Sequence, residues 1–260
     1  MIYITGDKHG DLEFVREFCS RHPDISRDDV LIILGDVGIN FDLNRKERKI
    51  KGMLSRLPIT LLCVHGNHEE RPRNLKSYRE VPCFEGIVYQ ERKYPNILFC
   101  KDGENYKIEN RYFFVLGGAY STDKYLRLEK EWKWFASEQP SPDDRINAEN
   151  TMRRFNHSFD LVLSHTCPRK YIGTKIKHAY VDDHEIDYST EDWLESIENR
   201  INYNHWYFGH FHKDIDISEK VTVLYDNVIE IREQRCSGKG QDLQISVHGW
   251  HHGSMDPESV

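Results

Sequence analysis

The sequence lacks three features that would exclude or indicate common protein classes. It has no C-x-x-C pair among its six cysteines, no apolar run long enough to cross a membrane, and no excess of basic residues, since the formal net charge is −7. We therefore expect reduced cysteines and no membrane partner. The acidic balance argues against a broad basic surface for extended duplex nucleic acid, whereas a small phosphorylated substrate needs only a local cluster of Lys or Arg.

We also expect no secretory leader, because a polar cluster begins at Gly6 and leaves no room for a charged start and an apolar region. We predict a cytoplasmic location on this ground. The length of 260 residues fits one domain. We place that domain at residues 1–232 and treat the polar, Gly-rich residues 233–260 as a C-terminal tail. The sequence does not indicate the oligomeric state.

The main pattern that is present is an apolar, β-rich run that ends abruptly in Gly, Asp, Asn or His. It occurs five times, at residues 2–5, 30–34, 61–64, 161–163 and 206–208. Continuous apolar runs predict strands that are covered on both faces. Segments with helical spacing of apolar residues lie between them, at 12–19, 50–57 and 193–201. This alternation predicts an α/β fold with a largely parallel inner sheet, whose ligands gather at the carboxyl ends of the strands.

Other stretches carry weaker structural signals. Residues 112–116 predict a strand, and residues 221–224 and 228–231 predict a hairpin because the turn-favouring pair Asp226-Asn227 joins them. Residues 168–187 show no period and predict a long loop. That loop carries four Lys or Arg residues, and both a solvated surface excursion and a substrate-binding role are open for it.

Polar side chains at the ends of the predicted strands indicate a metal site. Asp7 and His9 stand two positions apart, so on an extended strand end both lie on one face and can bind one cation together. Asp36 follows an apolar strand, where a buried carboxylate is costly unless a cation or several donors neutralise it. The other candidate ligands also follow predicted strands and are Asn67, His165, His210 and His212.

Seven ligands are more than the four that close a typical zinc site, so we expect two divalent ions. Asp36 is the candidate that bridges them, because it stands alone on its strand and its carboxylate has two oxygens. Mixed His, Asp and Asn ligation suits Mn, Fe or Zn rather than the all-oxygen cages of Ca or Mg, and we take Mn as the first choice.

Five short motifs, in this order, resemble those of the calcineurin-like metallophosphoesterase family. They are GDKHG from Gly6, GD from Gly35, GNHE from Gly66, SH from Ser164 and GHFH from Gly209. The resemblance implies a four-layer α/β/β/α sandwich of two mixed sheets flanked by helices, with a dinuclear metal centre at the strand ends. It also implies two ligand sets, Asp7, His9, Asp36 and His212 for one ion, and Asp36, Asn67, His165 and His210 for the other.

The resemblance further implies a mechanism. Two cations roughly 3.5 to 4 Å apart hold a bridging hydroxide that attacks phosphorus in line, and they neutralise phosphate oxygens. His68 follows the ligand Asn67 but stays off the metals, and we predict that it is the general acid that protonates the leaving alkoxide. Glu69 is expected to orient the loop or to cap a helix that follows.

Departures from the family guide the choice of substrate. Protein Ser/Thr phosphatases of this family continue the second motif to an Asp and an Arg, where this sequence has Ile39 and Asn40. They also have Arg before GNHE, where this sequence has His65. The missing arginine clamp argues against a protein phosphatase. It leaves Asp42 or Asn40 as the candidate partner of His68.

Substrate contacts must then come from other residues. Arg71 and Arg73 are the cations that follow His68 most closely, and guanidinium groups bind phosphate in bidentate fashion; the alternative for each is an exposed turn. Tyr120 follows the predicted strand at 112–116 and is predicted to reach the substrate. Three nearby aromatic residues fit either the core or a platform for a nucleobase, namely Trp132, Trp134 and Phe135.

These features predict a metal-dependent phosphoesterase. The first hypothesis is a phosphomonoesterase that acts on a small metabolite or a nucleotide. The alternative is a phosphodiesterase or nuclease that acts on cyclic or single-stranded nucleotides, and only the loops decide between the two. A metal-free scaffold would have lost ligands, whereas all seven ligand positions and His68 are present.

Overall fold

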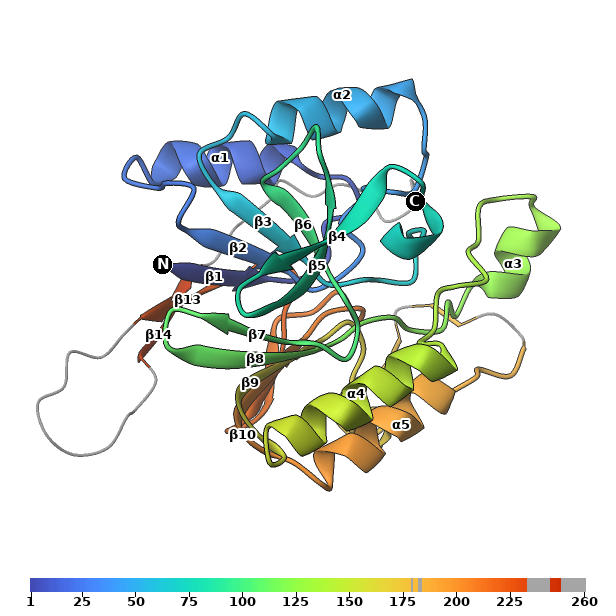
Figure 1. The fold of residues 1–260 in the computed structure, drawn as a ribbon. Coiled ribbons are helices and arrows are strands. Elements are labelled where there is room, and N and C mark those ends of the chain that lie inside the picture. Colours follow the sequence, from blue (N-terminus) through green and yellow to red (C-terminus); the bar gives the residue numbers. More distant parts are fainter. Residues whose placement is uncertain (179, 182–183, 233–243, 249–260) are drawn as a thin grey trace, which may run out of the picture.

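The computed structural model describes residues 1–178, 180–181, 184–232 and 244–248. Two mixed β-sheets pack face to face, and helices cover both outer faces (Figure 1). Over the described residues, the first sheet has eight strands in the spatial order β14 (Gln244–His248), β13 (Val228–Arg232), β1 (Ile2–Thr5), β2 (Val30–Ile33), β3 (Thr60–Cys63), β6 (Ile97–Cys100), β5 (Gly86–Glu91) and β4 (Tyr78–Cys83). The second has six, in the order β11 (Ile215–Ser218), β12 (Val221–Val223), β10 (Asn202–Phe208), β9 (Ser158–Ser164), β8 (Arg111–Leu116) and β7 (Asn105–Ile108).

The inner strands of both sheets are parallel. β1 pairs in parallel with β2, β2 with β3 and β3 with β6. In the second sheet, β9 pairs in parallel with both β8 and β10. The carboxyl ends of these strands therefore meet at one edge of each sheet, as the alternation of strands and helices predicts.

Helices on the two outer faces complete four layers. The first sheet is covered by α1 (Glu13–Arg21) and α2 (Arg45–Leu54), and the second by α4 (Pro142–Arg154) and α5 (Ser189–Glu198). A short helix, α3 (Lys124–Glu129), lies apart from the layers on the connection between β8 and α4 (Figure 1). Two 3-10 turns, η1 (Pro72–Asn74) and η2 (Arg169–Tyr171), complete the elements of the described chain.

Local sequence explains where helices begin. The side chain of Asn44 accepts hydrogen bonds from two backbone N–H groups of the first turn of α2. At α4, Ser141 and Asp144 form a capping box, and Pro142 occupies the first turn, where its missing N–H leaves no bond unmade.

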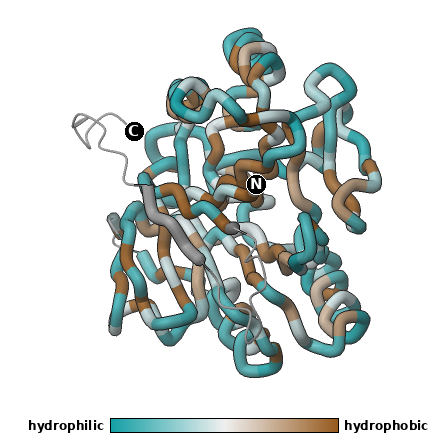
Figure 2. The backbone as a smooth tube through the Cα atoms, turned by 90° about the vertical axis from the view of Figure 1, so that its left-hand side faces the viewer, coloured by the Kyte–Doolittle hydropathy of each residue, from teal (hydrophilic) through white to brown (hydrophobic). Residues whose placement is uncertain are grey.

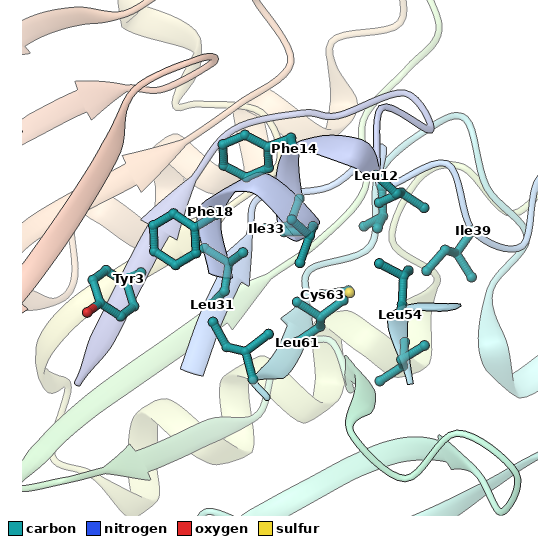
Figure 3. Packing of buried hydrophobic residues seen from close by; sticks show 14 of the residues in the cluster. Tyr3, Leu12, Phe14, Phe18, Leu31, Ile33, Ile39, Leu54, Leu61 and Cys63 are labelled. Carbon is teal, nitrogen blue, oxygen red and sulfur yellow. The ribbon is translucent and has the colours of Figure 1, made fainter. Parts of the chain in front are cut away.

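Three clusters of buried hydrophobic side chains separate the four layers. Leu31 and Ile33 of β2 face the helices, where Phe14 and Phe18 of α1 cover them (Figure 3). Ile32, between them in sequence, faces the other sheet. This strand has apolar side chains on both faces because both faces are covered. A third cluster lies between the second sheet and its helices.

Hydrophobic segments gather toward the middle of the molecule and hydrophilic ones on its outer turns (Figure 2). This distribution and the clusters confirm the predicted four-layer α/β/β/α sandwich. Across the part of the chain that the structure describes, every helix is too short or too polar to span a membrane.

One sequence prediction meets a different outcome. The hairpin is wrong, because β12 pairs with β10 and β11 in one sheet, whereas β13 pairs with β1 and β14 in the other. The carboxylate of Asp214 accepts hydrogen bonds from the backbone N–H groups of Tyr225, Asp226 and Asn227, so this turn is built to carry the chain from one sheet to the other. Within the predicted tail, the structure describes only β14, and the rest of residues 233–260 lies outside the described chain.

Candidate metal centre

The seven predicted ligands come together where the carboxyl ends of parallel strands meet. Asp7 lies two residues after β1, Asp36 three residues after β2, and His165 directly after β9. Asn67, His210 and His212 follow β3 and β10. Four of these side chains belong to buried residues and are Asp7, Asp36, Asn67 and His165. Buried carboxylates and imidazoles packed this closely need a compensating charge.

One group consists of Asp7, His9 and His212. Their ligand atoms lie within 4.8 Å of one another. The Nε2 atoms of His9 and His212 are 2.8 Å apart, and Asp7 Oδ2 lies 3.4 Å from His212 Nε2 and 3.9 Å from His9 Nε2. One carboxylate oxygen and two imidazole nitrogens therefore converge on one small volume, which suits a divalent transition metal.

A second group contains Asp36, His165 and Asn67. Asp36 Oδ2 lies 3.6 Å from His165 Nε2, and that nitrogen lies 2.7 Å from Asn67 Oδ1. The same carboxylate oxygen is 3.8 Å from His9 Nε2. Asp36 therefore faces both groups, which is the position that a bridging ligand needs.

Hydrogen-bond directions show that these residues fit a cation. His165 Nδ1 lies 2.7 Å from the carbonyl oxygen of Leu34, which can only accept, so Nδ1 carries a proton and Nε2 is the nitrogen that can bind a metal ion. That nitrogen faces the oxygen of Asn67, at 2.7 Å. A positive charge between the two atoms, either a proton on Nε2 or a bound cation, stabilises this close approach. The buried Nε2 of His210 has no partner among the described residues, and its ring centroid lies 5.0 Å from that of His165.

The backbone at the centre adopts a left-handed conformation that residues other than glycine rarely take. Four of the predicted ligands have a positive φ, namely His9 at 43°, Asp36 at 46°, His210 at 69° and His212 at 50°. Residues other than glycine adopt this region infrequently, and such strain gathers at functional sites.

The motif glycines make room for ligands from other strands. A Cβ on Gly66 would lie 2.1 Å from Asp36 Oδ1, and a Cβ on Gly209 would lie 2.1 Å from Asp7 Oδ1. Only glycine permits this approach. The Gly before Asn67 and the Gly before His210 are therefore explained by the carboxylates that pack against them.

Charges within the centre shift the pKa values of its groups. Burial alone would raise the pKa of Asp36, but His165, His68 and His9 outweigh burial and lower it. Burial lowers the pKa of His9, and it lowers the pKa of His210 well below the ordinary value. Neutral imidazoles and an ionised carboxylate are the protonation states that bind metal ions.

The predicted acid, His68, lies beside this centre. Its backbone N–H donates to Asp36 Oδ1 at 2.8 Å, and its ring centroid lies 5.7 Å from that of His9. Burial is the largest cause that lowers the pKa of His68, to about 4, followed by opposing effects of Asp36, which raises it, and Arg127, which lowers it. His68 thus neighbours the candidate metal centre without being part of its two ligand groups.

The two residues suggested as the partner of His68 contact other groups in the structure. Asn40 Oδ1 accepts from Lys51 Nζ at 2.8 Å and from the hydroxyl of Tyr78 at 3.0 Å, beneath α2. The carboxylate of Asp42 lies 3.6 Å from Lys133 Nζ. The charges that act on the His68 ring from outside the metal centre belong to Arg127 and Asp123, at the α3 segment.

The predicted substrate contacts of Arg71 and Arg73 are also not favoured. The guanidinium of Arg71 is buried against the carboxylate of Asp102, and its Nε donates to the carbonyl of Ser137 at 2.6 Å. Arg73 makes a bidentate ion pair with Asp144, at 2.5 and 2.9 Å. Both guanidinium groups fasten the loop after GNHEE to its neighbours.

Tyr120 is buried, and Lys124 Nζ lies 5.4 Å from its ring centroid. Its substrate contact stays a prediction. The segment that follows Tyr120 contains a residue that sequence reasoning missed. Ser121 Oγ accepts a hydrogen bond from Asn67 Nδ2 at 2.9 Å and donates to Glu138. The sequence signal that could have identified Ser121 is its position after β8, which is parallel to β9 and ends at the same edge of the sheet.

Glu69 holds two motifs together. Its carboxylate accepts from the N–H of Gly66 at 2.9 Å and from the N–H of Val37 at 3.2 Å. Burial raises the pKa of Glu69 well above its ordinary value. The expectation that Glu69 orients the loop is confirmed by these two bonds, and the helix-capping alternative is not, since η1 begins only at Pro72.

An open hollow of about 720 Å³ lies elsewhere in the molecule. Its lining includes Ser158 and Asn202, the first residues of β9 and β10, together with Tyr112 and Lys220. Because the predicted ligands follow the other ends of these strands, the hollow does not belong to the candidate metal centre.

Comparisons with known proteins agree with this geometry. The sequence matches the family model described as calcineurin-like phosphoesterase over residues 1–214. No curated protein sequence matches the chain. Among solved structures, TT1561 of Thermus thermophilus has 13% identity and a TM-score of 0.51, with 95% of this chain and 97% of that chain covered. This likeness supports the fold alone.

Two further solved structures have TM-scores below 0.5 and carry no argument about this chain. The phosphopantetheinyl hydrolase PptH of Mycobacterium tuberculosis has 14% identity and a TM-score of 0.43, with 86% and 87% of the two chains covered. A protein serine/threonine phosphatase from Saccharomyces cerevisiae has 15% identity and a TM-score of 0.37, with 97% and 81% covered. The family match spans most of the sequence and contains every predicted ligand. The chain therefore belongs to the calcineurin-like phosphoesterase family.

Proposed function

We propose that this metal-dependent hydrolase of phosphate esters acts on a phosphate monoester, carried by a small metabolite or a nucleotide. Membership of the family supports the phosphoesterase activity and the use of metal ions. The proposal adds the residues that carry the reaction and the class of substrate.

The single observation that carries the proposal is the convergence of His165 Nε2 on Asn67 Oδ1, at 2.7 Å, and on Asp36 Oδ2, at 3.6 Å. Three groups that can each bind a cation approach one another in this way when they are ligands of one ion. We assign Asp7, His9, Asp36 and His212 to one divalent ion, and Asp36, Asn67, His165 and His210 to the other. When bound, two such ions lower the pKa of a shared water and neutralise phosphate oxygens.

His68 is the proposed general acid. Its ring lies next to that of His9, and its backbone is fastened to Asp36, so it is held beside the metal centre. A general acid must carry a proton, and a pKa of about 4 leaves the free ring neutral at pH 7. This role therefore requires the phosphate charge of the bound substrate to raise the pKa of His68.

A small phosphate monoester is favoured over a phosphoprotein because the arginine clamp of protein phosphatases is missing from the second motif. The diester alternative has one observation in its favour. Trp132 is 50% exposed and follows α3, whereas Trp134 donates to Glu138 and Phe135 packs against Phe41. Of the three aromatic residues considered, Trp132 is thus the one that can stack on a nucleobase.

The test compares two chromogenic substrates on metal-stripped protein reloaded with Mn, Zn, Fe or Mg. We expect para-nitrophenyl phosphate to be hydrolysed faster than its bis-para-nitrophenyl diester. Asp36→Asn and His68→Ala should each lose activity, while His157→Asn, at the opposite end of β9 from His165, should keep it. Faster hydrolysis of the diester would favour the alternative, and hydrolysis that survives both substitutions would reject the assignment.

Two finer statements are also proposals. Manganese as the native metal rests on the mixed His, Asp and Asn donor set. A cytoplasmic location rests on the reduced cysteines expected from the sequence. Metal analysis of protein purified without added metal, and fractionation of the source cells, test them.

A further inference from the structure

Behind Asn67 lies a chain of three side chains from the segment after β8, of which Ser121 and Glu138 are buried and Trp134 is partly buried. Trp134 Nε1 donates to Glu138 Oε2 at 2.8 Å, and the hydroxyl of Ser121 donates to the same oxygen at 2.5 Å. Asn67 Nδ2 donates to Ser121 Oγ at 2.9 Å. Ser121 is 1% exposed and Glu138 2% exposed, so water cannot take the place of either group.

The directions of these bonds determine which way the amide of Asn67 points. A serine hydroxyl has one hydrogen, and here Glu138 receives it. Ser121 Oγ can then only accept from Asn67, and it must receive the NH₂ side of the amide. The oxygen of the amide is thereby turned toward His165, at 2.7 Å from Nε2.

Without this chain, the opposite orientation of the amide is better whenever the His165 ring is neutral, which is the form that binds a metal ion. In the neutral ring the proton is on Nδ1, where the carbonyl of Leu34 accepts it, so Nε2 is an acceptor. A flipped Asn67 would donate its NH₂ to Nε2 and form an ordinary hydrogen bond. The flipped amide would also direct N–H groups at the place where a cation binds, and it would oppose metal binding.

We propose that Ser121 and Glu138 are positioning residues that hold the Asn67 amide with its oxygen toward His165, so that the site is prepared for a cation. The inference rests on the metal centre of the proposed function. It adds two residues that contact neither the metal nor the substrate and act through Asn67. Partners of metal ligands in this outer shell commonly change metal affinity by about 10 to 100-fold.

Three variants test the proposal by isothermal titration of Mn²⁺ into metal-stripped protein. Ser121→Ala removes the acceptor and is expected to weaken the binding of one of two ions by about 10 to 100-fold. Glu138→Met removes the acceptor of the serine proton, so the Ser121 hydroxyl turns to the Asn67 oxygen and the same loss is expected. Ser137→Ala is the matched control, because its hydroxyl donates to Glu70 and not toward Asn67.

A second background separates the amide flip from general damage to the fold. In Asn67→Asp, position 67 offers oxygen in either orientation, so adding Ser121→Ala is expected to cause no further loss of Mn²⁺ affinity. Thermal unfolding of the metal-free proteins checks that each variant is folded. We expect Ser121→Ala to melt within a few degrees of the wild type, since the flipped amide regains a hydrogen bond.

Wild-type protein that binds no Mn²⁺ would overturn the proposed metal centre and this inference with it. Wild-type protein that binds two ions, with Ser121→Ala binding both equally tightly, would overturn the inference alone. An equal loss in Ser137→Ala would also overturn it, since that substitution leaves the orientation of the Asn67 amide unchanged. A further loss when Ser121→Ala is added to Asn67→Asp would overturn it as well, since position 67 then offers oxygen in either orientation.

Discussion

The Nε2 atoms of His9 and His212 lie 2.8 Å apart, although the two residues are 203 positions apart in the sequence. Asp7 Oδ2 lies 3.4 Å from the same nitrogen of His212. Burial alone would lower the pKa of His212, but the carboxylates of Asp7 and Asp36 outweigh it and raise the pKa. A positive charge is therefore favoured at this place, between the imidazole of His212 and the two carboxylates.

We expect His212→Ala to remove the binding of one ion and leave the other. The substitution removes one ligand atom from the group of Asp7, His9 and His212, whereas Asn67 and His165 keep theirs. Titration of metal-stripped protein with Mn²⁺ should show two equivalents for the wild type and one for the variant, with an affinity loss of at least about 10-fold at the affected site. His157→Asn controls for the loss of a histidine, and a variant that still binds two ions tightly would contradict the ligand assignment.

His68→Ala is expected to separate catalysis from metal binding. The side chain neighbours the metal centre but is outside both ligand groups, so Mn²⁺ affinity should stay within a factor of about three of the wild type, while kcat falls by roughly 100 to 10,000-fold, the range for a general acid. Titration and steady-state rates on a monoester measure the two effects. Unchanged kcat, or lost metal binding, would argue that His68 has another role.

The sequence predicted that the candidate ligands lie close together because of a general property of parallel sheets. Each motif follows a hydrophobic run, and the carboxyl ends of β1, β2 and β3 meet at one edge, so polar residues far apart in sequence become neighbours. The helices α1, α2 and α5 also show the expected apolar spacing. What the pattern cannot give is the orientation of a side chain such as Asn67, which depends on Ser121 and a distant carboxylate.

The errors have physical reasons of the same kind. The Asp226-Asn227 pair signals a turn, but a turn does not determine whether the strands on its two sides enter one sheet or two. β4 and β5 were missed because half-exposed strands have no continuous apolar run. The substrate contact of Arg71 and Arg73 stays a prediction, and the structure shows that their charges are paired with Asp102 and Asp144.

Arg127 is expected to contribute to substrate binding where Arg73 does not. Its Nε donates to Asp123 at 2.7 Å, which holds the guanidinium in place, and its charge lowers the pKa of His68. Arg127→Met should lower kcat/KM for a phosphomonoester by roughly 10 to 100-fold, the equivalent of a hydrogen bond to a charged group. Arg73→Met is the matched control and should leave KM unchanged. Equal effects of the two substitutions would contradict the prediction.

Glu191 is expected to make stability depend on pH. It lies buried in α5, where Oε1 accepts from the Thr166 hydroxyl at 2.9 Å and Oε2 has no partner among the described residues. Burial raises the pKa of Glu191 from 4.5 to about 7. Its contribution to stability is therefore fully present below pH 4.5, where the carboxyl is protonated in both the folded and the unfolded protein. This contribution is lost as the pH rises through 7.

Glu191→Gln should remove this dependence. In metal-free protein, we expect the variant to gain on the order of 3 kcal/mol over the wild type between about pH 4 and pH 8, measured by urea unfolding. Glu149→Gln is the contrast, because the hydrogen bond from Arg200 lowers the pKa of Glu149. That carboxylate stabilises the fold above its unfolded pKa, so its removal should weaken the protein at about pH 8 and not at low pH. A Glu191→Gln variant whose stability follows the wild type at every pH would show that this carboxyl is ionised or protonated alike in both states.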